Sequence, residues 1–118
     1  MKNRYKANEF DTKFYDARKV ASIGSFVEAW NILLDLSGTN NQQNLALFNL
    51  KLDISLKLNK SSDAIEQLKL LLSLSPSDVR YVNLLSELYS RTNNTSEAVK
   101  CWQKYISICP TNGSALFN

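Results

Sequence analysis

Hydrophobic and polar residues recur along this chain with the period of amphipathic helices, in stretches separated by short polar turns. Three turns each divide a pair of such stretches: Ile23–Ser25, Asn59–Ser62 and Thr92–Ser96. The first stretch of each pair would end at Gly24, Asn59 or Asn93. A helix C-cap often needs a residue in the left-handed conformation, which glycine adopts at the lowest cost and asparagine at the next lowest. Ser62 and Ser96, each followed by an acidic residue, predict the N-cap of the next helix. The pattern therefore predicts pairs of helices joined by tight turns.

The stretch Leu45–Asn59 is ambiguous, because apolar and polar residues alternate there as in a β-strand. At 100° per residue, however, its apolar residues form two stripes on opposite sides of a helix. One stripe contains Leu45, Phe48, Leu52 and Leu56, and the other contains Leu47, Leu50, Ile54 and Leu58. A helix that lies between two neighbours needs two apolar faces, so the helical interpretation is favoured over the strand.

An internal repeat organises the later part of the chain. The interval between Ala64 and Ala98 equals that between Pro76 and Pro110, and the residues between these marks match in kind. The segment Gly24–Leu36 shows the pattern once more. A period of about 34 residues indicates a helical-repeat protein, in which each unit buries its apolar face by stacking on its neighbours.

This pattern resembles the tetratricopeptide repeat family. The shared features are the period, a small residue at its twentieth place (Ala64 and Ala98) and a proline at its thirty-second (Pro76 and Pro110). The likeness covers about residues 10–112: Trp102 fits an aromatic place in the last repeat, and Gly24, Phe26 and Ala29 fit family places in the first, which lacks the closing proline. The resemblance implies an all-α fold, an α-solenoid of antiparallel helix pairs wound as a right-handed superhelix. It predicts one domain over residues 1–118, with repeats at about 10–43, 45–78 and 79–112 and with 113–118 as the start of a further or capping helix.

A polar line runs between the two apolar stripes of Leu45–Asn59, formed by Asn49, Asp53 and Lys57. The same order of amide, acid and base recurs one period later in Asn83, Glu87 and Arg91. The resemblance implies that the first helix of each repeat lines a concave groove, whose asparagines hold the backbone of a bound peptide. The expected groove residues are Phe14, Arg18, Asn49, Asp53, Lys57, Arg80, Asn83, Glu87 and Arg91. The alternative is a merely solvated face, on which acid and base pair within each helix.

Some members of the family grip a C-terminal carboxylate with basic residues of this groove. Arg80 matches one basic place of that clamp, but Leu84 and Phe14 stand where two others would be. The sequence therefore does not predict a carboxylate clamp.

The last helix predicts an apolar face formed by Trp102, Tyr105 and Ile106. In a longer array, of which this chain would be a fragment, the next repeat would cover this face. Tyr105 stands where the family prefers alanine, which admits the next repeat. One hypothesis is that this face docks on a partner or on a second copy, so that the chain is a structural subunit or a homo-oligomer. The other is that Trp102 packs in the core against Leu84 and Leu88.

Composition argues against several classes of function. The 118 residues suffice for one domain with its own core, and the net charge is only +3. The chain has no histidine and no glycine-rich phosphate loop. Cys101 and Cys109 lie too far apart along one predicted helix to form a disulfide, and they lack the partners of a zinc site. We therefore expect no enzymatic activity, no cofactor and no metal.

The remaining expectation is a protein–protein interaction scaffold or adaptor that binds a peptide or helix of another protein. Basic residues are scattered apart from an excess in the first twenty residues, so nucleic-acid binding is not predicted, and RNA binding through that segment is a weak alternative. A chaperone of the type III secretion kind, which also uses three such repeats, is a further alternative. The sequence shows neither a signal peptide nor a membrane span, which predicts a cytoplasmic protein.

Overall fold

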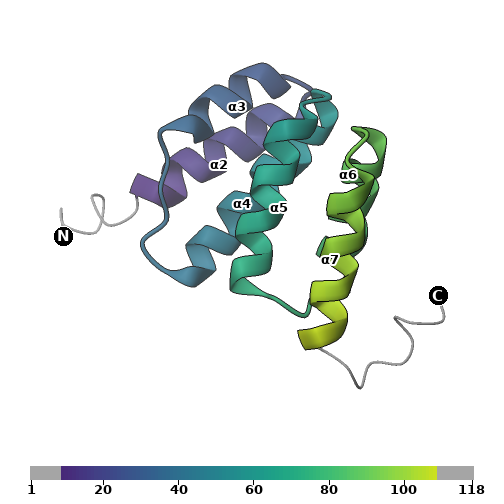
Figure 1. Ribbon diagram of the computed structural model, residues 1–118. Helices are drawn as coiled ribbons and strands as arrows, with labels where there is room; N and C mark the ends of the chain where they lie inside the picture. Colours follow the sequence, from purple (N-terminus) through teal and green to yellow (C-terminus); the bar gives the residue numbers. More distant parts are fainter. Residues whose placement is uncertain (1–8, 109–118) are drawn as a thin grey trace. The chain divides into compact units, whose positions relative to one another are not determined.

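The computed structural model describes residues 9–108, and its regular elements are all α-helices (Figure 1). They are α2 (Glu9–Ser22), α3 (Phe26–Leu34), α4 (Asn41–Lys57), α5 (Ser61–Leu74), α6 (Val79–Arg91) and α7 (Thr95–Ile108). Residues 9–108 contain no β-strand, so the predicted all-α helical-repeat class is confirmed. The chain divides into two compact units: Met1–Lys60, with α2, α3 and α4, and Ser61–Asn118, with α5, α6 and α7. Cys109, Pro110 and the helix expected at 113–118 lie outside the described residues.

The turns after α2, α4 and α6 share one hydrogen-bonded motif. Gly24, Asn59 and Asn93 have φ angles of 88°, 57° and 64°, so all three are left-handed as predicted. The following residue donates its N–H to a carbonyl five positions back: Ser25 to Val20 at 3.1 Å, Lys60 to Ser55 at 2.8 Å, and Asn94 to Tyr89 at 2.7 Å. This is the Schellman motif, which gives hydrogen-bond donors to carbonyls that a helix end would otherwise leave without a partner.

The residue after each left-handed position also starts the next helix, so the turns are shorter than predicted. Ser25 is the N-cap of α3, and its carbonyl already accepts the first helical hydrogen bond at 3.0 Å. Asn94 does the same for α7 at 3.1 Å. Ser62 and Ser96 therefore lie inside the first turns of α5 and α7, and their prediction as N-caps is wrong. The acidic residues that follow them are in those first turns, as predicted.

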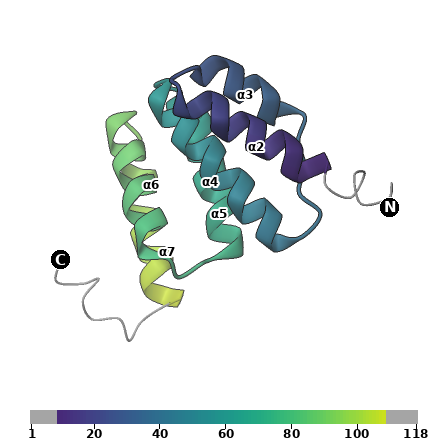
Figure 2. The ribbon, with the colours of Figure 1, turned by 180° about the vertical axis from the view of Figure 1, so that it is seen from behind.

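The first unit builds its core from α2, α3 and α4. Figures 1 and 2 show α2 and α3 lying side by side, and the fully buried Ala17 and Ala29 leave room for that close approach. The Trp30 ring packs against this core, and the Lys51 ammonium lies 5.6 Å from the ring centroid. The buried members are Phe10, Ala17, Ala29, Leu33, Leu36, Leu47 and Ile54.

Helix α4 covers most of the ambiguous stretch, which ends in the turn described above, so the helical interpretation is confirmed over the strand. Leu47 and Ile54 are buried in the core of the first unit, and Leu50 and Leu58 pack against it, as expected for one of the two stripes. The helix begins at Asn41 because the side chain of Asn40 accepts a hydrogen bond of 2.8 Å from the N–H of residue 43.

In the second unit, α6 packs against both α5 and α7. Its buried residues are Val82, Leu85, Ser86, Leu88 and Tyr89. Pro76 lies in the short turn between α5 and α6, where a proline prevents the chain from continuing as a helix. Because α5 and α7 pack on one helix, the space between them is the place where a pocket forms.

Candidate functional site

The predicted polar line of α4 is exposed in the structure. Asn49, Asp53 and Lys57, which we call the α4 line, are all exposed, although the positions between them include buried side chains. The amide of Asn49 donates a hydrogen bond of 2.8 Å to the carbonyl of Leu45, one turn earlier in the same helix. Within residues 9–108, Asp53 and Lys57 do not form the ion pair that their spacing predicts.

The equivalent line of α6 is exposed as well. Asn83, Glu87 and Arg91 form this α6 line, and the side chain of Asn83 makes no hydrogen bond within the described part of the chain. Arg91 and Glu87 approach to 3.4 Å, as their spacing predicts, and each side chain is 62% exposed. A pair so open to water contributes little to stability, so its charges can be exchanged for those of a partner.

Arg80, the basic residue expected in the groove, is held at the start of its own helix. The side chain of Asp78 caps α6 by accepting the N–H of Arg80 at 3.0 Å, and the Arg80 guanidinium binds the same carboxylate at 3.1 and 2.8 Å. These hydrogen bonds lower the pKa of Asp78, against the opposing effect of partial burial. The cap occupies two of the donors that Arg80 would offer to a ligand.

The two expected groove residues of α2 differ in their surroundings. The Phe14 ring is half-buried, packs against the core of the first unit and stacks on Phe10 with ring centroids 5.6 Å apart. Arg18 is exposed one turn later. Phe14 therefore contributes to the core, whereas Arg18 is open to solvent.

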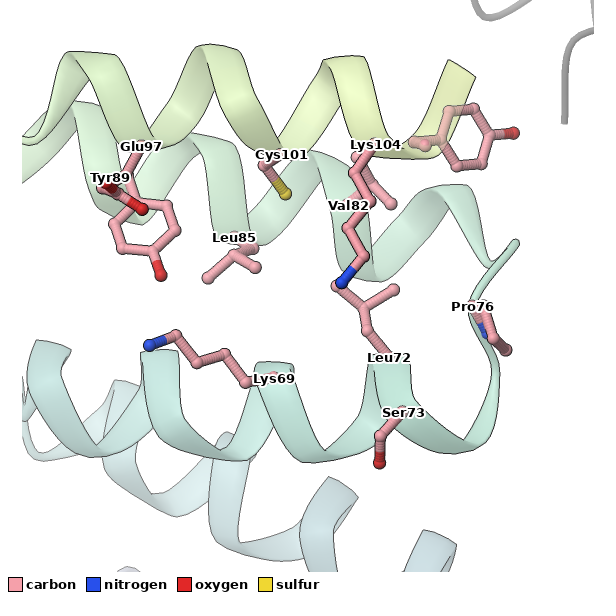
Figure 3. Close-up of a pocket in the computed structure, with 11 residues that line it drawn as sticks. Lys69, Leu72, Ser73, Pro76, Val82, Leu85, Tyr89, Glu97, Cys101 and Lys104 are labelled. Atoms are coloured by element: carbon pink, nitrogen blue, oxygen red, sulfur yellow. The ribbon is translucent and has the colours of Figure 1, made fainter. Parts of the chain in front are cut away.

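A pocket of about 560 Å³ lies in the second unit, with α5 on one side and α6 and α7 on the other (Figure 3). Leu72 of α5, Val82 and Leu85 of α6 and Tyr105 of α7 make its lining largely apolar. The other lining residues are Lys69, Ser73, Pro76, Tyr89, Glu97, Cys101 and Lys104. A volume of this size lies within the range of ordinary ligand sites, roughly 300–1,000 Å³.

The pocket carries a positive charge at its edge. Lys69 on α5 and Lys104 on α7 both line it, and neither forms an ion pair within residues 9–108. Glu97 is the acidic residue of the lining, and Lys100, which lies outside the lining, pairs with it at 3.3 Å. Figure 3 shows Lys104 reaching from α7 toward α5, and Lys69 extending along the opposite wall on the side of Tyr89.

Cys101 places its thiol on the wall of this pocket (Figure 3). Burial raises the pKa of the Cys101 thiol, and the Ser86 hydroxyl and the charge of Lys104 oppose that rise. The thiol is therefore a weak nucleophile at neutral pH.

The pocket and the α6 line use roughly opposite faces of the same helix. Val82, Leu85 and Tyr89 recur at the i, i+3, i+7 spacing of one face, and at 100° per residue Asn83 and Glu87 point away from them. The second unit thus offers two separate surfaces, one polar and exposed, the other apolar and hollow.

The expected apolar face of α7 is only partly on the surface. Tyr105 is 2% exposed and lines the pocket, and its ring meets Trp102 edge to face with centroids 5.8 Å apart. Trp102 and Ile106 are half-buried. A docking face built from these three residues would therefore lack the Tyr105 ring, because that ring belongs to the interior of the unit.

The sequence did not reveal the pocket, because its lining comes from three helices and follows no single period. Two signals bear on it in retrospect: the bulky Tyr105 at a place where the family prefers alanine, and the small Ser73 and Cys101 on the facing helices. Neither signal shows how far apart α5 and α7 lie.

Residues 9–108 contain no cluster of three or more potential metal ligands, and no helix among them is long and apolar enough to cross a membrane.

Comparison with known protein families supports the last of the predicted repeats. The sequence model of the tetratricopeptide repeat matches residues 79–112, which include α6, the turn after it and α7. The resemblance seen in the sequence is confirmed there. No curated protein with a similar sequence was found.

Among solved structures, the chain resembles the tetratricopeptide-repeat protein MamA, with a TM-score of 0.61 and 19% sequence identity. The match covers 95% of this chain and 65% of MamA, so the chain spans about 65% of the length of that protein. At this identity the likeness shows a shared helical-repeat fold. The repeat motif and the fold together support a general role as a protein-interaction scaffold.

Proposed function

We propose that this chain is a scaffold that binds an extended peptide or a helix of a partner protein through the α4 line and the α6 line. The observation that carries the proposal is the exposure of both lines. Amide, acid and base occupy equivalent places in two successive repeats, and all of these side chains face solvent in their own units. Helix support alone would account for the order of acid before base, but not for the asparagine that precedes it in both repeats, because asparagine is a poor helix former.

Asparagine is the residue of each line suited to hold a peptide backbone, because its amide both donates and accepts hydrogen bonds. Asn83 is the stronger candidate, since its side chain has no hydrogen bond to give up within the described residues. Asn49 would exchange its bond to the Leu45 carbonyl for one to the partner.

The charged residues around the asparagines would set the partner's charge pattern. Asp53, Lys57 and Arg18 are exposed in the first unit, and Glu87 and Arg91 are exposed in the second. We assign the peripheral contacts to these side chains. We assign a lesser part to Phe14 and Arg80, because the first packs in the core and the second binds its own N-cap.

The test begins with a partner captured by the full chain and identified by mass spectrometry. Its affinity is then measured for Asn49→Ala, Asn83→Ala and the double variant, with Asn31→Ala and Gln103→Ala as exposed controls on other helices. One lost hydrogen bond is worth about 0.5–1.5 kcal/mol, so each groove variant should weaken binding roughly 2- to 12-fold. The assignment fails if the double variant binds as tightly as the wild type, or if the control variants lose as much.

A further inference from the structure

We propose that the pocket between α5, α6 and α7 is a second docking site, which takes a short extended segment of a partner protein with apolar side chains flanked by aspartate or glutamate. The site lies on the face of α6 opposite to the α6 line, and nothing in the proposal depends on that line.

The shape of the pocket suits an extended segment a few residues long. Along α7 its lining runs from Glu97 to Tyr105, which at 1.5 Å per residue is roughly 12 Å. An extended chain advances about 3.3 Å per residue, so roughly four residues would match this length. The volume of about 560 Å³ has space for the side chains of such a segment as well.

The lining of the pocket favours apolar side chains in the bound segment. The accessible surface of the pocket is mainly apolar, and Leu72, Val82, Leu85 and Tyr105 are among the residues that line it. An aliphatic or aromatic side chain entering from water would remove apolar surface on both partners from contact with water. A polar side chain placed against these apolar residues would give up its hydrogen bonds to water without regaining them there.

The two lysines at the edge of the pocket favour acidic residues on either side of the apolar residues in the bound segment. Lys69 and Lys104 stand on facing walls without an ion-pair partner in the described chain, while Lys100 already pairs with Glu97. Their aliphatic stems can lie along the apolar walls while the ammonium groups remain at the edge. Carboxylates on either side of the inserted residues would meet these two amines, whereas a basic segment would be repelled.

The probe for binding is a fluorescein-labelled peptide in which leucine and phenylalanine alternate with glutamate, followed by fluorescence anisotropy on the full chain. Two matched peptides carry lysine in place of glutamate, or serine in place of leucine and phenylalanine. We expect the first peptide to bind at least about tenfold more tightly than either control, and added salt should weaken it, because exposed charge pairs are screened. Equal binding of the three peptides, or no binding of the first, overturns the proposal.

Charge reversal locates the site on the protein. Lys69→Glu combined with Lys104→Glu should weaken the acidic peptide at least about tenfold. Lys19→Glu combined with Lys60→Glu is the control matched in charge; both residues lie outside the two proposed sites, and this variant should leave the affinity unchanged. All four side chains are exposed, so the variants should keep the helical circular dichroism of the wild type. Equal losses in the double variant and in the control would show binding by general charge, and would overturn the assignment.

Cys101 provides a second measurement, because its thiol lines the pocket. In a Cys109→Ser background, Cys101 is the one remaining thiol, and the bound peptide should slow its alkylation by iodoacetamide. In a separate variant, Ser73→Trp should narrow the pocket and abolish peptide binding. Unprotected Cys101 at saturating peptide would place the peptide elsewhere and refute the site. Asn49→Ala and Asn83→Ala should not change peptide binding, so failure of this site and failure of the proposed function are separable.

Discussion

Replacing Gly24 with alanine tests the physical basis of the turn between α2 and α3. Gly24 has a φ of 88°, and a Cβ atom built on it would meet no other atom within 4 Å. The substitution therefore adds backbone strain without a clash. A left-handed conformation costs an ordinary L-residue about 1–2 kcal/mol. Alanine also loses less conformational entropy on folding than glycine, which returns about 0.4–1 kcal/mol. The net expectation is a loss of about 1 kcal/mol.

Asparagine at the same position is the matched comparison. Asn59 and Asn93 occupy the equivalent places in the other two turns with φ angles of 57° and 64°. Because a short polar side chain tolerates this conformation, Gly24→Asn should cost clearly less than Gly24→Ala. For the same reason Asn93→Gly should be neutral or slightly stabilising, and Asn93→Ala should be destabilising.

The assay is urea unfolding followed by tryptophan fluorescence. Trp30 and Trp102 are the two tryptophans of the chain, and each belongs to a different unit, so a Trp102→Phe background reports the first unit alone. With a slope of about 2 kcal/mol per molar urea, the loss expected for Gly24→Ala lowers the midpoint by ~0.5 M. The explanation is refuted if Gly24→Ala is as stable as the wild type, or if Gly24→Asn loses as much as Gly24→Ala.

Three further predictions concern a cap, a core residue and a surface pair. Asp78→Ala should cost about 0.5–2 kcal/mol through loss of the α6 N-cap, whereas Asp78→Asn should keep most of the cap. Since Arg80 lowers the pKa of Asp78 in the folded state, the wild type should lose this stability as the pH falls from about 4 through the folded pKa, and Asp78→Asn should lack that step when unfolding is measured against pH. Leu33→Ala, at a side chain with 0% exposure, should cost about 2–5 kcal/mol in the same urea experiment, and a loss below about 1 kcal/mol would contradict its place in the core. Glu87→Gln should change stability by less than about 1 kcal/mol, because the pair with Arg91 is open to water; a larger loss would show that the pair is structural.

The sequence predicted the turns well because their determinants are local. A left-handed C-cap depends on one residue and on carbonyls within five positions of it, so Gly24, Asn59 and Asn93 could be identified without knowing the fold. The N-caps of α5 and α7 were misplaced for an equally local reason: the residue after the left-handed one serves both helices, and the serine pattern does not show this.

The candidate site was predicted in part. The exposure of the α4 and α6 lines follows from helical phase, so the residues of each line could be named in advance. The binding of Arg80 to Asp78 could not be predicted, because the position of Arg80 in the repeat does not show which neighbour its guanidinium will bind. The burial of Tyr105 was likewise missed, since its place in the repeat marks it as unusual without showing where the ring goes.

The sequence by itself determined the helices, the left-handed turns, the recurring order of the polar lines and the lack of histidine, because each depends on residue type or on spacing within one or two helices. The tertiary structure decided where α5 and α7 lie on α6. That packing fixed the pocket, brought Lys69 and Lys104 to facing walls and removed Tyr105 from the surface. The physical reason is that the width of a gap between helices depends on side chains distant in sequence, and no repeat in the chain encodes it.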